Sequence, residues 1–332
     1  MNAPAVPILI SRTALDVLGS HIDGALEERA WQAIVPGEAG PDALRTVQVA
    51  FISRDVTGTA TKSVISPSLQ AFYDVLRSAQ ALRWVHTHSA GADRPIYPEL
   101  RARGVVVTTS SGANAPIVAQ SAVGGVLALA RRFPALMVAQ REHRWAPLLG
   151  EAIPPDLAGQ SAVVVGWGPA GQRIGELLQV FGLHVTVVRH RAEPAGPGLP
   201  TLTYDRLREC LPGAHWLVLV CPLTDLTRGL VDADMLATLP RGAFLVNVAR
   251  GEVVEESAVL EALRSGQLGG AHLDVFSHEP LAASSPLWDM PNVLLTPHAA
   301  GHSQGNVARV SQIFVANLRA WARGEDMRNL VS

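Results

Sequence analysis

The chain has 332 residues, of which 48% are hydrophobic and 17% charged, and its 27 basic and 29 acidic side chains leave a formal net charge of −2. At about 150 residues per domain this length indicates two domains, and the apolar content excludes an intrinsically disordered protein. The near-balance of charge gives no reason to expect nucleic acid or an anionic membrane as a partner.

The N-terminus and the two cysteines indicate a cytoplasmic protein. Residues 1–10 contain no basic segment followed by a long apolar core, so no signal peptide is expected. The longest uncharged apolar stretch, 110–130, is interrupted by Gly, Asn, Ser and Gln, and we expect a buried helix there rather than a membrane span. Cys210 and Cys221 are interpreted as buried or half-buried thiols in a reducing compartment.

Short apolar, β-branched runs alternate with helical patterns, which predicts parallel sheets built from βαβ units. In the first third of the chain, residues 67–79 place Leu69, Phe72 and Leu76 at helical spacing. This part of the chain is interpreted as one open α/β unit. The strands expected in it are Pro7–Ile10, Val47–Ser53, Trp84–Thr87 and Val105–Thr108.

A second series of strands fits a six-stranded, doubly wound dinucleotide-binding sheet. The clearest helices between its strands are 230–239 and 255–265, and Gly266 is placed to cap the second of them. Two stretches rich in Gly and Pro, 147–159 and 195–200, are predicted loops or arms. The six strands expected are Ala162–Val165, His184–Val188, Trp216–Val220, Phe244–Asn247, Gly270–Asp274 and Val293–Thr296.

The last segment, 303–323, has the pattern of one amphipathic helix. We expect this helix to return to the first α/β unit, which would then be discontinuous. The predicted fold class is therefore α/β, with two Rossmann-like, doubly wound parallel-sheet domains and an interdomain cleft. A substrate (catalytic) domain would comprise residues 1–114 and 300–332, and a dinucleotide-binding domain residues 115–299.

The strongest local signal is a Gly-x-Gly-x-x-Gly run at residues 166–171, between a β-branched strand and a predicted helix. Gly166 would allow the tight turn, Gly168 the close approach of a pyrophosphate, and Gly171 close packing of helix on strand. The phosphates would then lie at the N–H groups of the helix N-terminus. A purely structural turn is the alternative, but the flanking strand and helix favour a dinucleotide site.

The end of the next strand decides which nicotinamide dinucleotide fits. An NAD site is expected to place a carboxylate there for the ribose 2′-hydroxyl. This chain has Arg189, His190 and Arg191 instead, and its nearest carboxylate is Glu193. One guanidinium group can bind two phosphate oxygens at once. The basic turn therefore favours the 2′-phosphate of NADP(H). NAD(H) and a solvated basic turn are the alternatives.

Arg250, Glu279 and His298 each follow a predicted strand and suit hydride chemistry on a carbonyl next to a carboxylate. His298 is a candidate proton donor to the carbonyl oxygen, because histidine titrates near neutral pH. Glu279 would orient the imidazole of His298, and Arg250 would hold the substrate carboxylate and polarise the carbonyl. Each residue alone has a structural alternative, and it is their joint pattern that favours catalysis.

With these motifs, the chain resembles the D-isomer-specific 2-hydroxyacid dehydrogenase family over nearly its whole length. The motifs are the Gly-rich turn, Val-Asn-Val-Ala-Arg-Gly at 246–251, Leu-Asp-Val-Phe at 273–276 with Glu279-Pro280, and the run 285–301 that contains Thr-Pro-His-Ala-Ala-Gly. The resemblance implies an Arg/Glu/His catalytic set, a closing cleft, a homodimer and a D-2-hydroxy acid product. No metal ion is expected.

The resemblance also implies ligand contacts at further positions. Ser89, Ala90 and Gly91 match the loop whose backbone amides hold the substrate carboxylate, and Asp274 would hold the nicotinamide carboxamide. Trp145 falls in what looks like a dimerisation arm, where an anchoring role is as good an interpretation as a substrate contact. The remaining expected cofactor contacts are Pro169, Ala170, Cys221, Pro222, Thr227, Val248, Ala249, His298 and Gly301.

Two departures from the family pattern refine the prediction. The basic turn 189–191 looks like the arrangement in NADPH-dependent glyoxylate or hydroxypyruvate reductases, and the uncharged Gln120 stands where the family often has an acidic residue. The favoured function is reduction of glyoxylate, hydroxypyruvate or a similar small 2-oxo acid with NADPH. The alternatives are an NAD(H)-linked D-2-hydroxyacid dehydrogenase for a larger substrate, with Arg54 and Arg94 as cations if that substrate carries phosphate, and a nicotinamide-sensing interaction protein.

Overall fold

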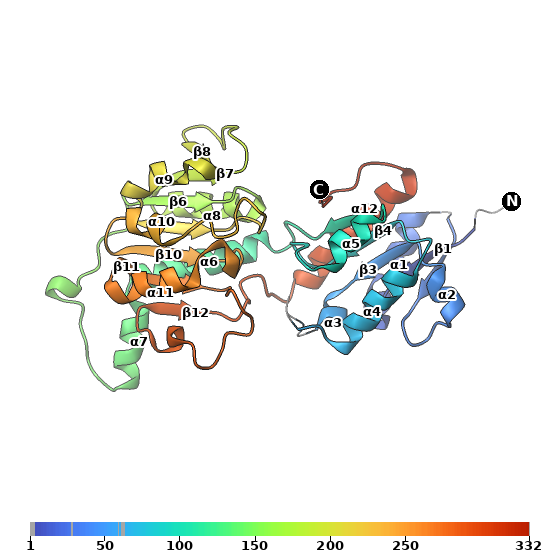
Figure 1. Cartoon of the computed structure of the whole chain (residues 1–332), viewed down its shortest axis with the longest axis horizontal. Coiled ribbons are helices and arrows are strands. Elements are labelled where there is room, and N and C mark those ends of the chain that lie inside the picture. The colour runs from blue at the N-terminus through green and yellow to red at the C-terminus, as the bar shows by residue number, and fades with distance from the viewer. Residues whose placement is uncertain (1–3, 28, 59, 61–63, 332) are drawn as a thin grey trace. The chain divides into compact units, whose positions relative to one another are not determined.

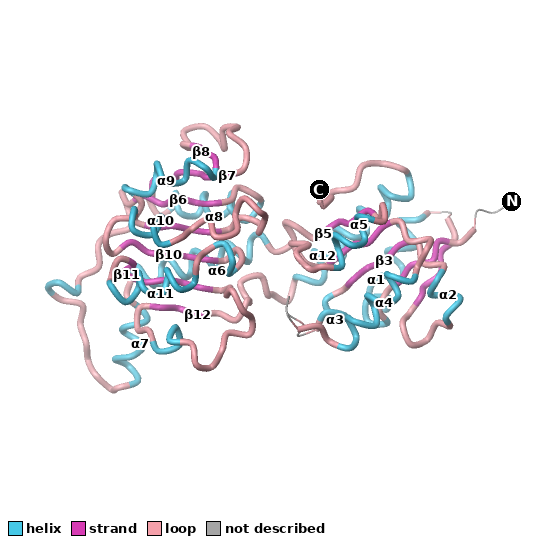
Figure 2. The backbone as a smooth tube through the Cα atoms, viewed as in Figure 1, coloured by secondary structure: helices cyan, strands magenta, loops and turns pink. Residues whose placement is uncertain are grey.

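The computed structural model describes residues 4–27, 29–58, 60 and 64–331. The chain divides into two compact units, residues 1–114 with 303–332 (unit 1) and residues 115–302 (unit 2). Figure 1 shows each unit as a sheet covered by helices, and in Figure 2 the magenta strands of each unit lie between cyan helices. The predicted fold class, two parallel-sheet α/β units of which the first is discontinuous, is confirmed.

Unit 1 has a five-stranded parallel sheet in the order β2-β1-β3-β4-β5, which is the flavodoxin-like doubly wound order. Its strands are β1 (Val6–Leu9), β2 (Trp31–Ile34), β3 (Val49–Ile52), β4 (Trp84–Thr87) and β5 (Val106–Thr109). Its helices are α1 (Arg12–Leu26), α2 (Pro41–Arg45), α3 (Arg54–Thr57), α4 (Pro67–Ser78), α5 (Ile96–Ala102) and α12 (Asn306–Arg323).

The C-terminal helix α12 completes unit 1. Val310, Phe314 and Leu318 lie one turn apart and are buried in one core with residues of α1, β1 and β3. Beyond the helix the chain runs along β5, where the N–H of Thr109 donates to the Asn329 carbonyl at 3.0 Å. The opposite face of the sheet packs on α4 and α5. Without α12, the α1 face of the sheet would lose much of its apolar cover.

Unit 2 has a seven-stranded parallel sheet in the order β12-β11-β10-β9-β6-β7-β8, a dinucleotide-binding order with one strand added beyond β11. Its strands are β6 (Ser161–Val165), β7 (His184–Arg189), β8 (Thr201–Thr203), β9 (Trp216–Leu219), β10 (Ala243–Asn247), β11 (Leu268–Leu273) and β12 (Val293–Leu295). Its helices are α6 (Ala115–Ala130), α7 (Phe133–Arg141), α8 (Pro169–Val180), α9 (Leu207–Cys210), α10 (Ala233–Thr238) and α11 (Glu256–Ser265). Single 3₁₀ turns are η1 (Gly150–Ala152), η2 (Tyr204–Arg206), η3 (Leu211–Gly213), η4 (Gly251–Val253) and η5 (Pro286–Asp289).

Two apolar layers enclose this second sheet. Helices α6 and α8 bury one face, and α9, α10 and α11 bury the other. Helix α6 is buried along most of its length, as expected for the apolar stretch 110–130. No single described helix is long and apolar enough to cross a bilayer; α6 and α7 taken together are, by length and composition, but the chain bends by 68° between them.

Several element boundaries differ from the sequence predictions. The short edge strands β2 and β8 were not predicted, because β2 is only partly buried and β8 has three residues. The helix expected at 230–239 spans only 233–238, since Asp232 caps it by accepting from the Met235 N–H at 2.8 Å. Val231 instead forms a β-bridge with Val254. The last helix begins at residue 306 rather than 303.

A buried histidine lies at the centre of unit 1. The side chain of His86 is 0% exposed, and its two ring nitrogens lie 2.8 Å from Thr108 Oγ1 and 3.0 Å from Ser110 Oγ. The rings of Phe51 and Phe314 pack against it. Burial lowers the pKa of His86 to about 3, so the ring is neutral in the folded protein near neutral pH.

His86 therefore makes the stability of unit 1 depend on pH. Between its ordinary pKa of 6.5 and its folded value of about 3, the unfolded chain binds a proton that the folded chain does not. The free energy of unfolding should consequently fall as the pH falls from about 6.5. His86→Phe removes this titration, so its urea-unfolding free energy should decline less steeply than that of the wild type between about pH 6.5 and 4.5. Equal slopes in tryptophan-monitored unfolding would contradict the assignment.

Candidate functional site

The carboxyl ends of the unit 2 strands bring the predicted site residues to one edge of the sheet. Gly166 follows β6, Arg189 ends β7, and Arg250 comes three residues after β10. Asp274 directly follows β11, and His298 comes three residues after β12. In an open parallel sheet this edge binds ligands, at the point where the strand order reverses. Here that point lies between β6 and β9.

The Gly-rich turn has the geometry that a pyrophosphate needs. Gly166 has a φ of +107°, and a Cβ atom there would lie 2.6 Å from the backbone nitrogen of Cys221, which follows β9. A Cβ on Gly171 would lie 2.1 Å from the Gly166 carbonyl oxygen, whereas Gly168 faces open space. Helix α8 begins at Pro169, and no side chain caps its N-terminus. Its first N–H groups are thus placed for an anion, so these residues fit a dinucleotide.

The basic turn at the end of β7 has an aromatic neighbour that the sequence did not single out. Arg189 is half-buried, while His190 and Arg191 are exposed. Tyr204 directly follows β8, and its ring centroid lies 6.4 Å from that of His190. Burial raises the pKa of Tyr204 to about 12, so its hydroxyl keeps its proton at neutral pH and can donate a hydrogen bond.

Cys221 and Thr227 shape the loop that follows β9. The Cys221 thiol is buried, and burial raises its pKa to about 12, so it does not act as a nucleophile near neutral pH. Thr227 is fully buried; its hydroxyl donates to the Pro222 carbonyl at 2.6 Å and accepts from the Thr224 N–H at 2.8 Å. The Thr227 side chain therefore stabilises the conformation of this loop by bonding to its backbone.

A single buried carboxylate organises the turn after β12. Asp274 Oδ1 accepts from the Thr296 hydroxyl at 2.6 Å and from the backbone N–H groups of Ala299 and Ala300 at 2.8 and 3.0 Å. The Asp274 carbonyl accepts the N–H of His298 at 2.8 Å. His298 adopts a left-handed backbone conformation, with a φ of +51°. The turn around Asp274 holds it there.

Glu279 and His298 are in direct contact. His298 Nδ1 lies 2.8 Å from Glu279 Oε2, and the other carboxylate oxygen, Oε1, accepts the N–H of Phe276 at 3.1 Å. The Glu279 side chain is 9% exposed and that of His298 48%. With Nδ1 donating to a carboxylate, Nε2 is the nitrogen left to exchange a proton with a ligand.

Asn247 positions the turn that carries Arg250. Its side chain is fully buried at the end of β10; Oδ1 accepts the N–H of Ala249 at 3.0 Å, and Nδ2 donates to the Arg250 carbonyl at 3.2 Å. The Arg250 guanidinium donates to the Ala249 carbonyl at 2.7 Å. In the sequence, Asn247 is distinguished only as an amide at the end of an otherwise apolar strand, and this signal alone predicts no role.

The predicted site residues thus fall into two groups. Arg250, Glu279 and His298 lie at the same edge of the unit 2 sheet, and Glu279 and His298 share a hydrogen bond. The loop Ser89–Gly91 follows β4 in unit 1, where the Ser89 carbonyl accepts the N–H of Ser110 at 2.9 Å. A meeting of this loop with the residues of unit 2 stays a prediction.

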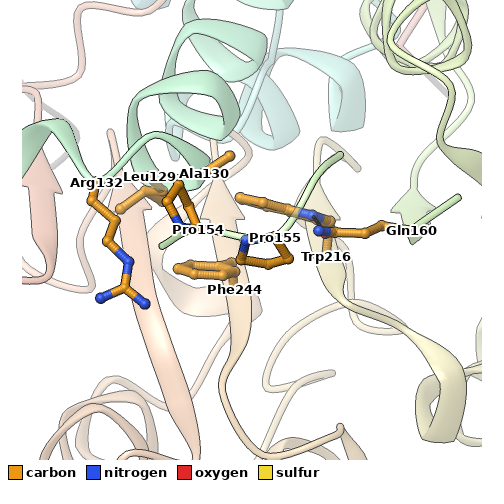
Figure 3. Close-up of a pocket in the computed structure, with 8 residues that line it drawn as sticks. All are labelled: Leu129, Ala130, Arg132, Pro154, Pro155, Gln160, Trp216 and Phe244. Carbon is orange, nitrogen blue, oxygen red and sulfur yellow. Dashed lines mark hydrogen bonds between the residues drawn. The ribbon is translucent and has the colours of Figure 1, made fainter. Parts of the chain in front are cut away.

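A hollow lies at the opposite, amino-terminal edge of the unit 2 sheet (Figure 3). Trp216 and Phe244 stack there with ring centroids 4.5 Å apart, at the starts of β9 and β10. Pro154 and Pro155 lie against the hollow and belong to the segment between α7 and β6, which we call the arm. Its volume of about 40 Å³ leaves room for a few waters and not for a dinucleotide. We interpret this hollow as the place where the end of the arm nearest β6 packs onto the sheet.

The family model for the NAD binding domain of D-isomer specific 2-hydroxyacid dehydrogenases matches residues 123–300. This chain belongs to that family. It is 30% identical over 263 residues to a glyoxylate/hydroxypyruvate reductase of Arabidopsis thaliana, covering 79% of this chain and 80% of that protein. It is 32% identical over 264 residues to a glyoxylate reductase of Korarchaeum cryptofilum, covering 78% and 79%.

Solved structures agree with this assignment. A D-isomer specific 2-hydroxyacid dehydrogenase from Xanthobacter autotrophicus Py2, in complex with NADPH and MES, is similar with a TM-score of 0.78 and 30% identity, covering 99% of this chain and 98% of the other. The chain is accordingly an NAD(P)-dependent oxidoreductase of the 2-hydroxyacid dehydrogenase type.

Proposed function

We propose that this dehydrogenase reduces a small 2-oxo acid, such as glyoxylate or hydroxypyruvate, to the D-2-hydroxy acid with NADPH. The main support is the 2.8 Å hydrogen bond between His298 Nδ1 and Glu279 Oε2, at the same sheet edge as the Gly-rich turn. An imidazole oriented by a carboxylate suits the transfer of a proton to the carbonyl oxygen. When bound, the reduced nicotinamide supplies the hydride.

Residues of the protein would bind the substrate, donate the proton and orient the nicotinamide. The Arg250 guanidinium would bind the substrate carboxylate and draw charge onto the carbonyl oxygen, together with the backbone amides of Ser89–Gly91. His298 would give its proton to that oxygen. Asp274 Oδ2 accepts from the Ala300 N–H at 3.1 Å, and this carboxylate would also accept from the nicotinamide carboxamide. These four contributions fix the orientation of the substrate and of the nicotinamide ring.

A small substrate is supported by the two curated relatives at about 30% identity, which are named for the reduction of glyoxylate or hydroxypyruvate. A phosphate-bearing substrate would need a further cation beside the loop Ser89–Gly91. Arg94, three residues after Gly91, donates through Nη2 to the Ala60 carbonyl at 3.1 Å, while its buried Nη1 atom has no hydrogen-bond partner. Arg94 therefore favours neither class of substrate.

The cofactor preference would follow from the end of β7. Arg189 and Arg191 would bind the 2′-phosphate of NADPH, and Tyr204 could donate to the same group, since its hydroxyl stays protonated at neutral pH. No carboxylate follows β7 before Glu193 to hold a free ribose 2′-hydroxyl.

The unpaired thiols Cys210 and Cys221 fit the reducing cytoplasm, which we propose as the location of the enzyme.

A spectrophotometric screen of small 2-oxo acids against NADPH and NADH tests this proposal. We expect turnover of glyoxylate or hydroxypyruvate with a higher kcat/KM for NADPH. Arg191→Ala should reduce the NADPH/NADH ratio of kcat/KM by about 10-fold or more, because a charged hydrogen bond to phosphate is lost. Arg173→Ala is the matched control, since Arg173 is paired with Glu176 on α8, and it should leave the ratio unchanged. A preference for NADH would refute the cofactor assignment, and no turnover of any 2-oxo acid would refute the function.

We further propose that two copies of the chain associate through the arm between α7 and β6, which is drawn in green beside unit 2 in Figure 1. Several apolar side chains on α7 and on this arm are exposed, which is unusual for a surface without a partner. They are Phe133, Met137, Trp145, Leu149 and Ile153, with Trp145 93% exposed. Their covering by a second copy would account for this exposure, and Trp145 would then act as an anchor.

Sedimentation velocity measures this association. The wild type should sediment as a dimer of the 35.2 kDa chain. Leu149→Asp should give the monomer, because it would place a charge in an apolar contact. Val180→Asp is the control, since Val180 is also exposed but lies at the end of α8, outside the arm; this variant should remain a dimer. A monomeric wild type would contradict the proposal.

A further inference from the structure

The backbone beside Arg250 is packed tightly against the loop that leads to Glu279. A Cβ atom on Gly251 would lie 1.8 Å from the carbonyl carbon of Phe276 and 2.3 Å from the backbone nitrogen of Ser277. The turn after β10 and the loop after β11 therefore touch backbone to backbone. This contact sets the position of Arg250 relative to the loop that leads to Glu279.

A single carboxylate fastens this contact. Glu256 is the first residue of α11, five positions after Gly251, and it is half-buried. Its Oε2 atom accepts the backbone N–H of Ser277 at 3.0 Å and the Ser277 hydroxyl at 2.7 Å. Both donors come from one residue and converge on one oxygen, so the bond pair fixes the orientation of the Ser277 backbone.

The segment that Glu256 holds is connected directly to Glu279 and His298, the pair proposed to donate the proton. Phe276 precedes Ser277, and its N–H donates to Glu279 Oε1 at 3.1 Å. The other oxygen of Glu279 accepts from His298 Nδ1 at 2.8 Å. A shift of the Ser277 backbone would move the Phe276 N–H, and with it the carboxylate that orients the imidazole.

We propose that Glu256 is a positioning residue for catalysis, which holds the Glu279 loop against the Arg250 turn through Ser277. This inference rests on the proposed function. The structural alternative is that Glu256 only supplies negative charge to the N-terminus of α11, where any acidic residue is favourable. Glu255 offers the matched control: it is exposed, lies at the same helix end and makes no side-chain cap hydrogen bond.

The kinetic test compares three variants under the conditions of the screen. Glu256→Ala should lower kcat for the 2-oxo acid by about 100-fold, since a misplacement of about 1 Å in a catalytic constellation has this effect. Its KM for NADPH should stay near the wild-type value, because the Gly-rich turn is untouched. Glu256→Gln should recover most of the loss, because its amide oxygen can accept the same two bonds. Glu255→Ala should behave as wild type.

Hydrogen exchange of the peptide 275–281 gives a readout that does not need activity. We expect faster exchange of this segment in Glu256→Ala than in the wild type, and unchanged exchange in Glu255→Ala. The Phe276 side chain stays buried in the core, so the Glu256→Ala chain should fold. If it does not, Ser277→Ala, which removes one of the two donors, takes its place and should show the same kinetic and exchange changes to a smaller degree.

The outcomes separate the two proposals. Equal losses in Glu255→Ala and Glu256→Ala, or wild-type kcat and exchange in Glu256→Ala, would overturn the positioning role. A wild type that reduces no 2-oxo acid would overturn the proposed function alone, and the exchange comparison would still decide whether Glu256 holds the loop.

Discussion

The site depends on the hydrogen bonds that the Asp274 carboxylate accepts from the turn after β12. It accepts one hydroxyl and two backbone N–H groups from the turn that carries His298. A hydrogen bond to a charged group contributes about 1.5–3 kcal/mol, whereas a left-handed backbone costs a residue other than glycine about 1–3 kcal/mol. The three bonds together outweigh the strain at His298. The imidazole is therefore held where the carboxylate of Glu279 meets it.

Parallel topology explains why residues so distant in sequence can form one site. Strands β6, β7, β9, β10, β11 and β12 all end at one edge, so each following turn delivers one or two side chains there. The turns are then tied to each other rather than to the sheet alone. Gly166 contacts the backbone of Cys221, and Gly251 contacts that of Phe276. At both contacts any side chain would force neighbouring turns apart, and for this reason glycine is required.

The parts of the site that could be predicted from sequence are those fixed by local chemistry. The Gly-rich turn could be found because its geometry requires three glycines within a run of six residues, placed between a strand and a helix. Arg250, Glu279 and His298 could be found because each follows a strand and has a side chain suited to the reaction. The edge strands β2 and β8 could not, because they are short and only partly buried. Thr296 and Glu256 were missed for a different reason. Their roles depend on hydrogen bonds to other turns, such as the one from Ser277 to Glu256 across 21 positions, and no local pattern indicates such a partner. The bonds of Asn247 to Ala249 and Arg250 are local, but an amide at the end of an apolar strand does not by itself indicate which backbone groups it binds.

The proposed reaction depends on His298 as the proton donor. The most direct measurement is the turnover number of His298→Ala with NADPH and the best 2-oxo acid, alongside the affinity for NADPH measured by fluorescence. We predict a loss in kcat of between about 100-fold and 10,000-fold, the range that general acid–base catalysis contributes, with NADPH affinity close to that of the wild type. A variant that turns over at nearly the wild-type rate would contradict the assignment.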